Sequence, residues 1–120
     1  MLNLDTHILV FALNGSLNAK ERELLANDHW GISGIVLWEL SKLAEFGRIS
    51  LDLNDPDFEE AISRVHVWPI TLEVCRAIAQ LDFDSDPANE IIAATSMNEG
   101  APLVTRDKKL RASKVVPLAH

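Results

Sequence analysis

Short apolar runs alternate with longer amphipathic stretches along this chain. The short runs predict buried strands at 1–5, 30–33, 66–70, 102–105 and 114–118. The longer stretches have helical spacing and predict helices at 6–13, 18–28, 34–46, 54–65, 71–81 and 87–100, with a short helical turn at 106–112. Strands that alternate with helices favour an α/β fold, in which a parallel sheet carries helices on both faces.

The composition is that of a folded protein. The chain has 120 residues, of which 48% are hydrophobic, enough for one domain spanning 1–120 and too few for two. No apolar run approaches the roughly 20 residues of a membrane span, and no basic leader precedes the first apolar run. Cys75 is the only cysteine, which fits a reducing cytoplasm. Within the expected helix 71–81, it is expected to be a small core hydrophobe.

The charge is acidic overall but unevenly spread. A net charge of −7 argues against a simple nucleic-acid-binding module, whose surface should be basic. Five of the eleven Lys and Arg residues nevertheless fall between Arg106 and Lys114. This run is either a solvated helix face or a local rim that attracts phosphate.

Acidic and amide side chains follow several of the expected strands. Asp5 closes the first strand, and Asp107 comes two residues after the strand 102–105. Glu39 lies on the helix that follows 30–33, and Asn89 is in the first turn of the helix 87–100. Ligands of open parallel sheets bind at the carboxyl ends of the strands. We therefore expect these four side chains to converge on one edge of the sheet.

Grouped carboxylates repel one another unless a cation neutralises them. Oxygen donors suit Mg²⁺ or Mn²⁺ better than zinc, and two such ions can hydrolyse a phosphodiester. Helix capping is the alternative role for an aspartate such as Asp107. The four histidines lack the spacing of zinc ligands and are interpreted as structural or surface residues: His7, His29, His66 and His120.

Three segments together resemble the PIN domain, and in particular VapC-type toxins of toxin–antitoxin modules. They read "LNLDTHILVFAL", "GISGIVLWELSKLAEFGRISL" and "DPANEIIAATSMNEGAPLVTRDKKL". The resemblance implies a PIN-like three-layer sandwich and an endoribonuclease that uses one or two Mg²⁺ or Mn²⁺ ions. It also implies a VapB-like antitoxin and a homodimer. The family's catalytic and metal-binding acids carry over to Asp5, Glu39 and Asp107, and its third acid falls at Asn89.

Asparagine at position 89 departs from that family pattern. It keeps a carbonyl oxygen but lacks a full negative charge, so a second metal should bind more weakly and activity should be weakened or silenced. Asp86 or Glu90 offers partial compensation, although Glu90 also suits the first turn of a helix. In the alternative, the chain is a catalytically inactive PIN-fold module that binds antitoxin or RNA.

Two threonines and the basic run near the acids are expected to have secondary roles in the site. The hydroxyls of Thr6 and Thr105 flank two of the acids and are candidates to orient an acid or a metal-bound water. The basic run is interpreted as a phosphate-binding rim that brings RNA to an acidic protein, through Arg106, Lys108, Lys109 and Arg111.

Two other families fit less well. Phosphatases of the haloacid-dehalogenase type need a second aspartate two residues after the nucleophile, and that position is His7 here. No glycine-rich phosphate loop follows any expected strand, which argues against dinucleotide binding.

Overall fold

A four-stranded parallel sheet runs through the middle of the protein. The computed structural model describes residues 1–120. The strand order is β3-β2-β1-β4, so the first strand lies between the second and the fourth. The strands are β1 (Leu2–Leu4), β2 (Trp30–Ser33), β3 (His66–Trp68) and β4 (Leu103–Val104). Asn3 of β1 is in register with Gly31 of β2 on one side and Leu103 of β4 on the other.

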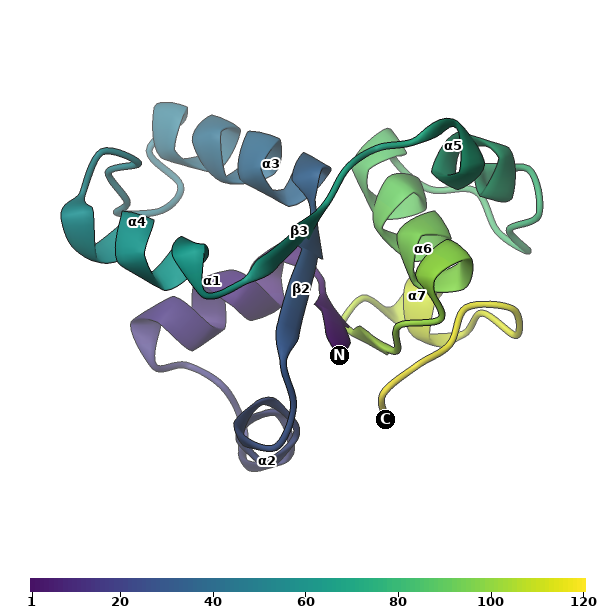
Figure 1. Ribbon diagram of the computed structural model, residues 1–120, viewed down its shortest axis with the longest axis horizontal. Helices are drawn as coiled ribbons and strands as arrows, with labels where there is room; N and C mark the ends of the chain where they lie inside the picture. Colours follow the sequence, from purple (N-terminus) through teal and green to yellow (C-terminus); the bar gives the residue numbers. More distant parts are fainter.

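Helices cover both faces of this sheet (Figure 1). In the figure, α1, α3 and α4 lie on one side of the strands and α5 and α6 on the other. The predicted α/β three-layer sandwich with a parallel sheet is therefore confirmed. None of the helices is long and apolar enough to span a membrane. Their bounds are α1 (Thr6–Asn14), α2 (Ala19–Ala26), α3 (Gly34–Glu45), α4 (Pro56–Ser63), α5 (Leu72–Ile78), α6 (Pro87–Glu99) and α7 (Lys108–Arg111).

The central strands are buried on both faces, as their apolar sequences require. Leu4, Ile32 and Leu103 have no exposed surface, and all three belong to the main core. Asn3 is the polar exception in β1. Its buried side-chain amide donates hydrogen bonds to the Ile92 carbonyl (3.0 Å) and the Ser96 hydroxyl (2.8 Å). These bonds attach the middle of the sheet to α6, the helix that carries Asn89.

The expected strand at 114–118 is wrong. This segment makes only an isolated parallel bridge, between Leu118 and Leu103, with two backbone hydrogen bonds beside it. Pro117 lacks an N–H group and cannot extend the ladder. The segment therefore borders β4 without forming a fifth strand.

The prediction that Cys75 is a core residue is also wrong, because its side chain is exposed. Helix α5 packs against α6 through Val74 and Ala77, which belong to a second small core cluster. Cys75 follows Val74 on the helix and is turned away from that contact. A helix of only seven residues is too short for its spacing to reveal which positions are buried.

Candidate active site

Two aspartates stand where β1 and β4 end, and both cap a helix. Asp5 is the N-cap of α1, and its Oδ1 accepts a hydrogen bond from the Thr6 backbone N–H (2.8 Å). Asp107 is the N-cap of α7, and its Oδ1 accepts from the Leu110 backbone N–H (3.0 Å). The capping role considered for Asp107 is therefore real. It uses one oxygen and leaves Oδ2 without a protein donor.

Helices α3 and α6 bring the other two predicted side chains to the same edge. Glu39 is half-buried on α3, and its Oε1 accepts a short hydrogen bond from the Thr6 hydroxyl. Asn89 lies in the first turn of α6, where its backbone N–H donates to Asp86 (2.9 Å). Its side-chain amide donates to the Ser85 hydroxyl (3.2 Å).

These four side chains line a single cavity of about 370 Å³. The convergence expected from the ends of parallel strands is thus present in the fold. The volume lies within the roughly 300–1,000 Å³ range of small-molecule sites. The complete lining is Asp5, His7, Phe11, Glu39, Asp86, Asn89, Arg106 and Asp107.

Thr105 connects the two aspartates beneath the cavity. It is fully buried, and its hydroxyl donates to Asp5 Oδ2 (2.6 Å) while it accepts from the Asp107 backbone N–H (3.0 Å). One hydroxyl therefore fixes the carboxylate of Asp5 relative to the start of α7. Thr6 has a matching role, because its backbone N–H contacts Asp5 and its hydroxyl contacts Glu39.

Burial raises the pKa of Asp5 above 3.8, and the Asp107 charge adds to that effect. Hydrogen bonds from Thr105 and Thr6 and the nearby His7 oppose it. Burial also raises the pKa of Glu39 above 4.5, with further contributions from the Asp5 and Asp86 charges and opposition from the Thr6 hydrogen bond. Both carboxylates are thus held where negative charge is costly, and a bound cation would relieve that cost.

The donor set suits a hard cation. Glu39 Oε2, Asn89 Oδ1 and Asp107 Oδ2 receive no hydrogen bond from the protein. No three His, Cys, Asp or Glu side chains stand close enough together to enclose an ion by themselves. Mg²⁺ usually keeps several of its waters and binds directly through one or two carboxylates. The arrangement therefore fits a hydrated hard cation better than a fully dehydrated one.

The remaining predicted site residues are distributed differently. Asp86 lines the cavity, whereas the Glu90 carboxylate accepts from the Ser85 backbone N–H (3.1 Å) at the start of α6. Among the four basic residues, only Arg106 lines the cavity. Lys109 donates to the Asp84 carbonyl (2.8 Å), Arg111 contacts the Thr105 carbonyl and His120, and Lys108 is exposed.

Three residues at or beside the cavity were missed in the sequence. His7 was interpreted as structural or surface; it is exposed, but it lines the cavity together with Phe11. The signal was available, because His7 and Phe11 are four apart on the helix that Asp5 caps. Glu21 had no such signal: it is 1% exposed and pairs with Arg106, 85 positions away (Arg106 Nη2 to Glu21 Oε1, 2.7 Å).

Replacing Thr105 by Val is expected to damage both the fold and the site. The two side chains have nearly the same shape, but Val loses the hydrogen bonds to Asp5 and Asp107. We expect a loss of about 1–3 kcal/mol in the free energy of unfolding. Urea denaturation measures this effect. Thr105→Ser keeps the hydroxyl and serves as the control, so equal defects in both variants would contradict the bridging role.

Replacing Arg106 by Met is expected to cost more stability than Glu21→Gln. Arg106→Met leaves the buried Glu21 carboxylate without its partner. Glu21→Gln leaves the Arg106 guanidinium unpaired, but that side chain is already 42% exposed. We expect about 2 kcal/mol for Arg106→Met, since the exposed guanidinium is partly screened. Urea denaturation compares the two variants, and a larger loss for Glu21→Gln would contradict this ranking.

The same ion pair predicts a pH dependence. The Arg106 hydrogen bond lowers the pKa of Glu21 below 4.5 in the folded protein. The stabilisation that the ion pair provides is therefore fully present above the unfolded-state pKa of about 4.5. It is lost as the pH falls through the lower folded-state pKa. Arg106→Met should flatten this part of the stability–pH curve, which denaturation at neutral and acidic pH would reveal.

The fold and the cavity define a class of protein, an α/β protein whose parallel sheet ends in a group of carboxylates suited to hard divalent cations. The profile of the PIN domain matches residues 3–115, and the chain therefore belongs to the PIN-domain family. The resemblance found in the sequence is confirmed.

Individual relatives agree with this assignment. Ribonuclease VapC22 of Mycobacterium tuberculosis is 32% identical over 90 residues, which cover 72% of this chain and 69% of that protein. A chain in the crystal structure of VapBC2 from Rickettsia felis, bound to a DNA fragment from their promoter, has a TM-score of 0.71 at 23% identity, over 98% of this chain and 97% of that one. A chain in DNA-bound VapBC from Salmonella typhimurium has a TM-score of 0.73 at 22% identity, over 98% and 97%.

Proposed function

We propose that this chain is a VapC-like endoribonuclease that hydrolyses RNA phosphodiesters with Mg²⁺ or Mn²⁺, and that Asn89 weakens or silences it. One observation carries the proposal: four segments deliver Asp5, Glu39, Asp107 and Asn89 to one cavity at the carboxyl edge of the sheet. The relative named a ribonuclease supports the reaction class. The proposed unit is a single PIN-like domain over 1–120 that acts in the cytoplasm.

Each residue of the site has a role in this proposal. Asp5, Glu39 and Asp107 would hold one or two ions, and Asn89 would contribute only a neutral oxygen. Ions bound there would supply an activated water and stabilisation of the leaving oxygen of the phosphodiester. Thr105 fixes the orientation of Asp5, and Thr6 does the same for Glu39. These hydrogen bonds keep the carboxylates in place before any ion arrives.

The basic residues are proposed to attract the RNA backbone. Lys108 is exposed directly beyond Asp107, which places a charge next to the cavity without a competing partner. The contacts of Lys109 and Arg111 with backbone carbonyls leave both residues cationic at the surface. Together with Arg106 they form a local positive rim on an acidic protein, and such a rim steers polyanions in a salt-dependent manner.

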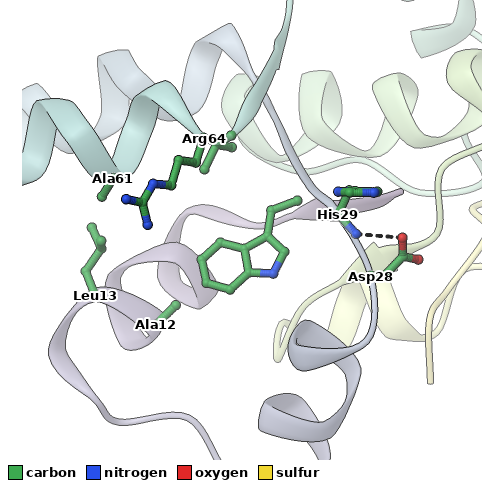
Figure 2. Close-up of a pocket in the computed structure, with 8 residues that line it drawn as sticks. Ala12, Leu13, Asp28, His29, Ala61 and Arg64 are labelled. Atoms are coloured by element: carbon green, nitrogen blue, oxygen red, sulfur yellow. Dashed lines mark hydrogen bonds between the residues drawn. The ribbon is translucent and has the colours of Figure 1, made fainter.

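A VapB-like antitoxin is the proposed partner, because chains of similar fold occur in VapBC complexes. A largely apolar pocket of about 390 Å³ lies apart from the acidic cavity. Figure 2 shows Ala12 and Leu13 of α1 facing Ala61 and Arg64 of the α4 segment across it. A second cavity of about 400 Å³ shares Leu13 and includes Arg48. Apolar walls with arginines at the rim suit an amphipathic, acidic segment of a partner.

A homodimer is proposed through a different surface. Trp38 on α3 is 54% exposed. It lines an apolar groove with Ile35, Pro87 and Ala88, which also contacts Glu39 and Asp86 at the edge of the acidic cavity. A large exposed aromatic in an apolar groove is typical of protein interfaces.

RNA cleavage with and without metal tests the proposed function. We expect cleavage by the Asn89→Asp form in Mg²⁺ or Mn²⁺, its loss in EDTA, and its return when metal is restored. Weak or absent cleavage is expected from the parent chain. If neither form cuts RNA under any of these conditions, the chain is better described as an inactive PIN-fold module that binds antitoxin or RNA.

A further inference from the structure

We propose that His7, Phe11 and Arg106 form a nucleobase-binding subsite inside the acidic cavity. The subsite would hold the base of a nucleotide next to the phosphate that is cut. This inference rests on the proposed ribonuclease function, and it concerns how the RNA is held and not how it is hydrolysed.

Three flat groups form one wall of the cavity, with the rings of His7 and Phe11 next to each other and the Arg106 guanidinium stacked over Phe11. His7 and Phe11 project from the same face of α1, with ring centroids 6.3 Å apart and planes inclined by 38°. The guanidinium carbon of Arg106 lies 4.1 Å above the Phe11 ring centroid. Phe11 is the only apolar side chain in the lining, and its phenyl ring supplies no oxygen or nitrogen ligand to a cation. A cavity that held only ions would gain nothing from this side chain.

The guanidinium of Arg106 is fixed before any ligand binds. Its Nε donates to Glu21 Oε2 (2.8 Å), and its Nη2 donates to Glu21 Oε1 (2.7 Å) and the Ser16 carbonyl (3.2 Å). The two N–H groups on Nη1 have no protein acceptor, so they are available to a base or ribose oxygen. Unstacked RNA bases bind to aromatic rings and to arginine planes of this kind.

The wall stands directly beside the carboxylates. His7 is two residues after Asp5, and Arg106 immediately precedes Asp107. The six waters around a hydrated Mg²⁺ ion occupy ~180 Å³ at their volume in the liquid. The cavity of about 370 Å³ is about twice that size. A nucleotide whose phosphate lies at the acids therefore has both the room and the partners for its base.

A substrate lacking one base provides the test. The Asn89→Asp form is used, after its cut position in a short single-stranded RNA has been mapped. Cleavage of this RNA is compared with that of the same RNA carrying an abasic ribose on either side of the cut. His7→Ala and Phe11→Leu are introduced separately, because His7 is exposed and leucine fills most of the Phe11 volume. Arg106 is left unchanged, because its loss would leave the buried Glu21 carboxylate without a partner and destabilise the fold.

We expect each variant to raise KM about tenfold for the ordinary RNA while kcat changes little. An abasic ribose on the side of the cut that the subsite holds should raise KM similarly for the Asn89→Asp form. It should raise KM little further for the His7→Ala and Phe11→Leu variants of that form. The matched controls, Phe46→Leu and His66→Ala, alter exposed residues that do not line the cavity and should leave KM unchanged.

Two other outcomes would overturn the inference. KM changes that are absent, or equal for the ordinary and abasic RNA, would remove the subsite while leaving the ribonuclease function intact. If the Asn89→Asp form cuts no RNA, the ribonuclease function itself fails, and the subsite fails with it.

Discussion

Asn89→Asp is expected to raise kcat/KM for RNA cleavage about 100-fold or more. The three proposed metal ligands, Asp5, Glu39 and Asp107, carry three negative charges, whereas two divalent cations carry four positive ones. Asp86 also lines the cavity, but its carboxylate caps α6. A fourth charge about 4 Å from a cation contributes up to ~4 kcal/mol at an effective dielectric near 20, and solvent reduces that value. The change is nearly isosteric, and Ser85 can donate its hydroxyl to the new carboxylate where it now accepts from the amide.

Metal binding provides a second readout for this substitution. The added carboxylate lies in the cavity with Asp86 and Glu39, so the metal-free variant should melt at a lower temperature than the parent. Mg²⁺ or Mn²⁺ should raise its Tm by more than it raises that of the parent. Asn98→Asp makes the same chemical change at the exposed end of α6 and serves as the control. An unchanged response to metal and an unchanged cleavage rate would contradict the role assigned to position 89.

Asp5→Asn, introduced into the Asn89→Asp form, is expected to lower cleavage about 1,000-fold, since it removes the charge of a central ligand. The fold should survive. Asparagine is as good an N-cap as aspartate, so it can still accept the hydrogen bond from the Thr6 backbone N–H. Asp55→Asn is the matched control, because Asp55 also caps a helix, α4, at an exposed position, where its side chain accepts from the Asp57 backbone N–H.

The same substitution predicts a pH effect in the metal-free protein. Burial raises the pKa of Asp5 in the folded state above the unfolded-state value of about 3.8. Between the unfolded-state and folded-state pKa values, the folded state therefore binds more protons than the unfolded state. The free energy of unfolding therefore falls as the pH rises through this window and stays lower above it. The amide introduced by Asp5→Asn does not titrate. The Tm of this variant minus the Tm of the Asn89→Asp form should therefore increase with pH. Thermal melts in EDTA from acidic to neutral pH measure this trend. Retained cleavage, or a Tm difference that does not change with pH, would contradict the expected role of Asp5.

Hydrophobic spacing predicted the layers of this fold because burial is periodic within each element. Strands such as β2 are buried along almost their whole length, and helices such as α3 alternate buried and exposed faces. The rule that parallel strands end at one edge then placed Asp5 and Asp107 together. The same reasoning failed at 114–118, where apolar residues precede and follow Pro117 but the missing N–H prevents a ladder.

Contacts between distant segments account for what the sequence did not reveal. The pairing of Glu21 with Arg106 depends on how α2 lies against the end of β4, and no local pattern records that arrangement. Thr105 was a candidate on proximity alone, and only the structure shows its bonds to both aspartates. The position of His7 follows from the helix that Asp5 caps, because His7 lies on the same face as Phe11, one turn before it.

The position of β1 between β2 and β4 has a consequence for synthesis. Asn3 pairs with Leu103, so the strand made first acquires one of its neighbours only after about 100 further residues have been translated. Pairings this distant in sequence form late in folding, because a long loop must close first. Until β4 docks, Asp5 and Asp107 are not neighbours. A nascent chain therefore does not carry the proposed nuclease centre in assembled form, and the translating ribosome's own RNA is not exposed to one while most of the chain is being made.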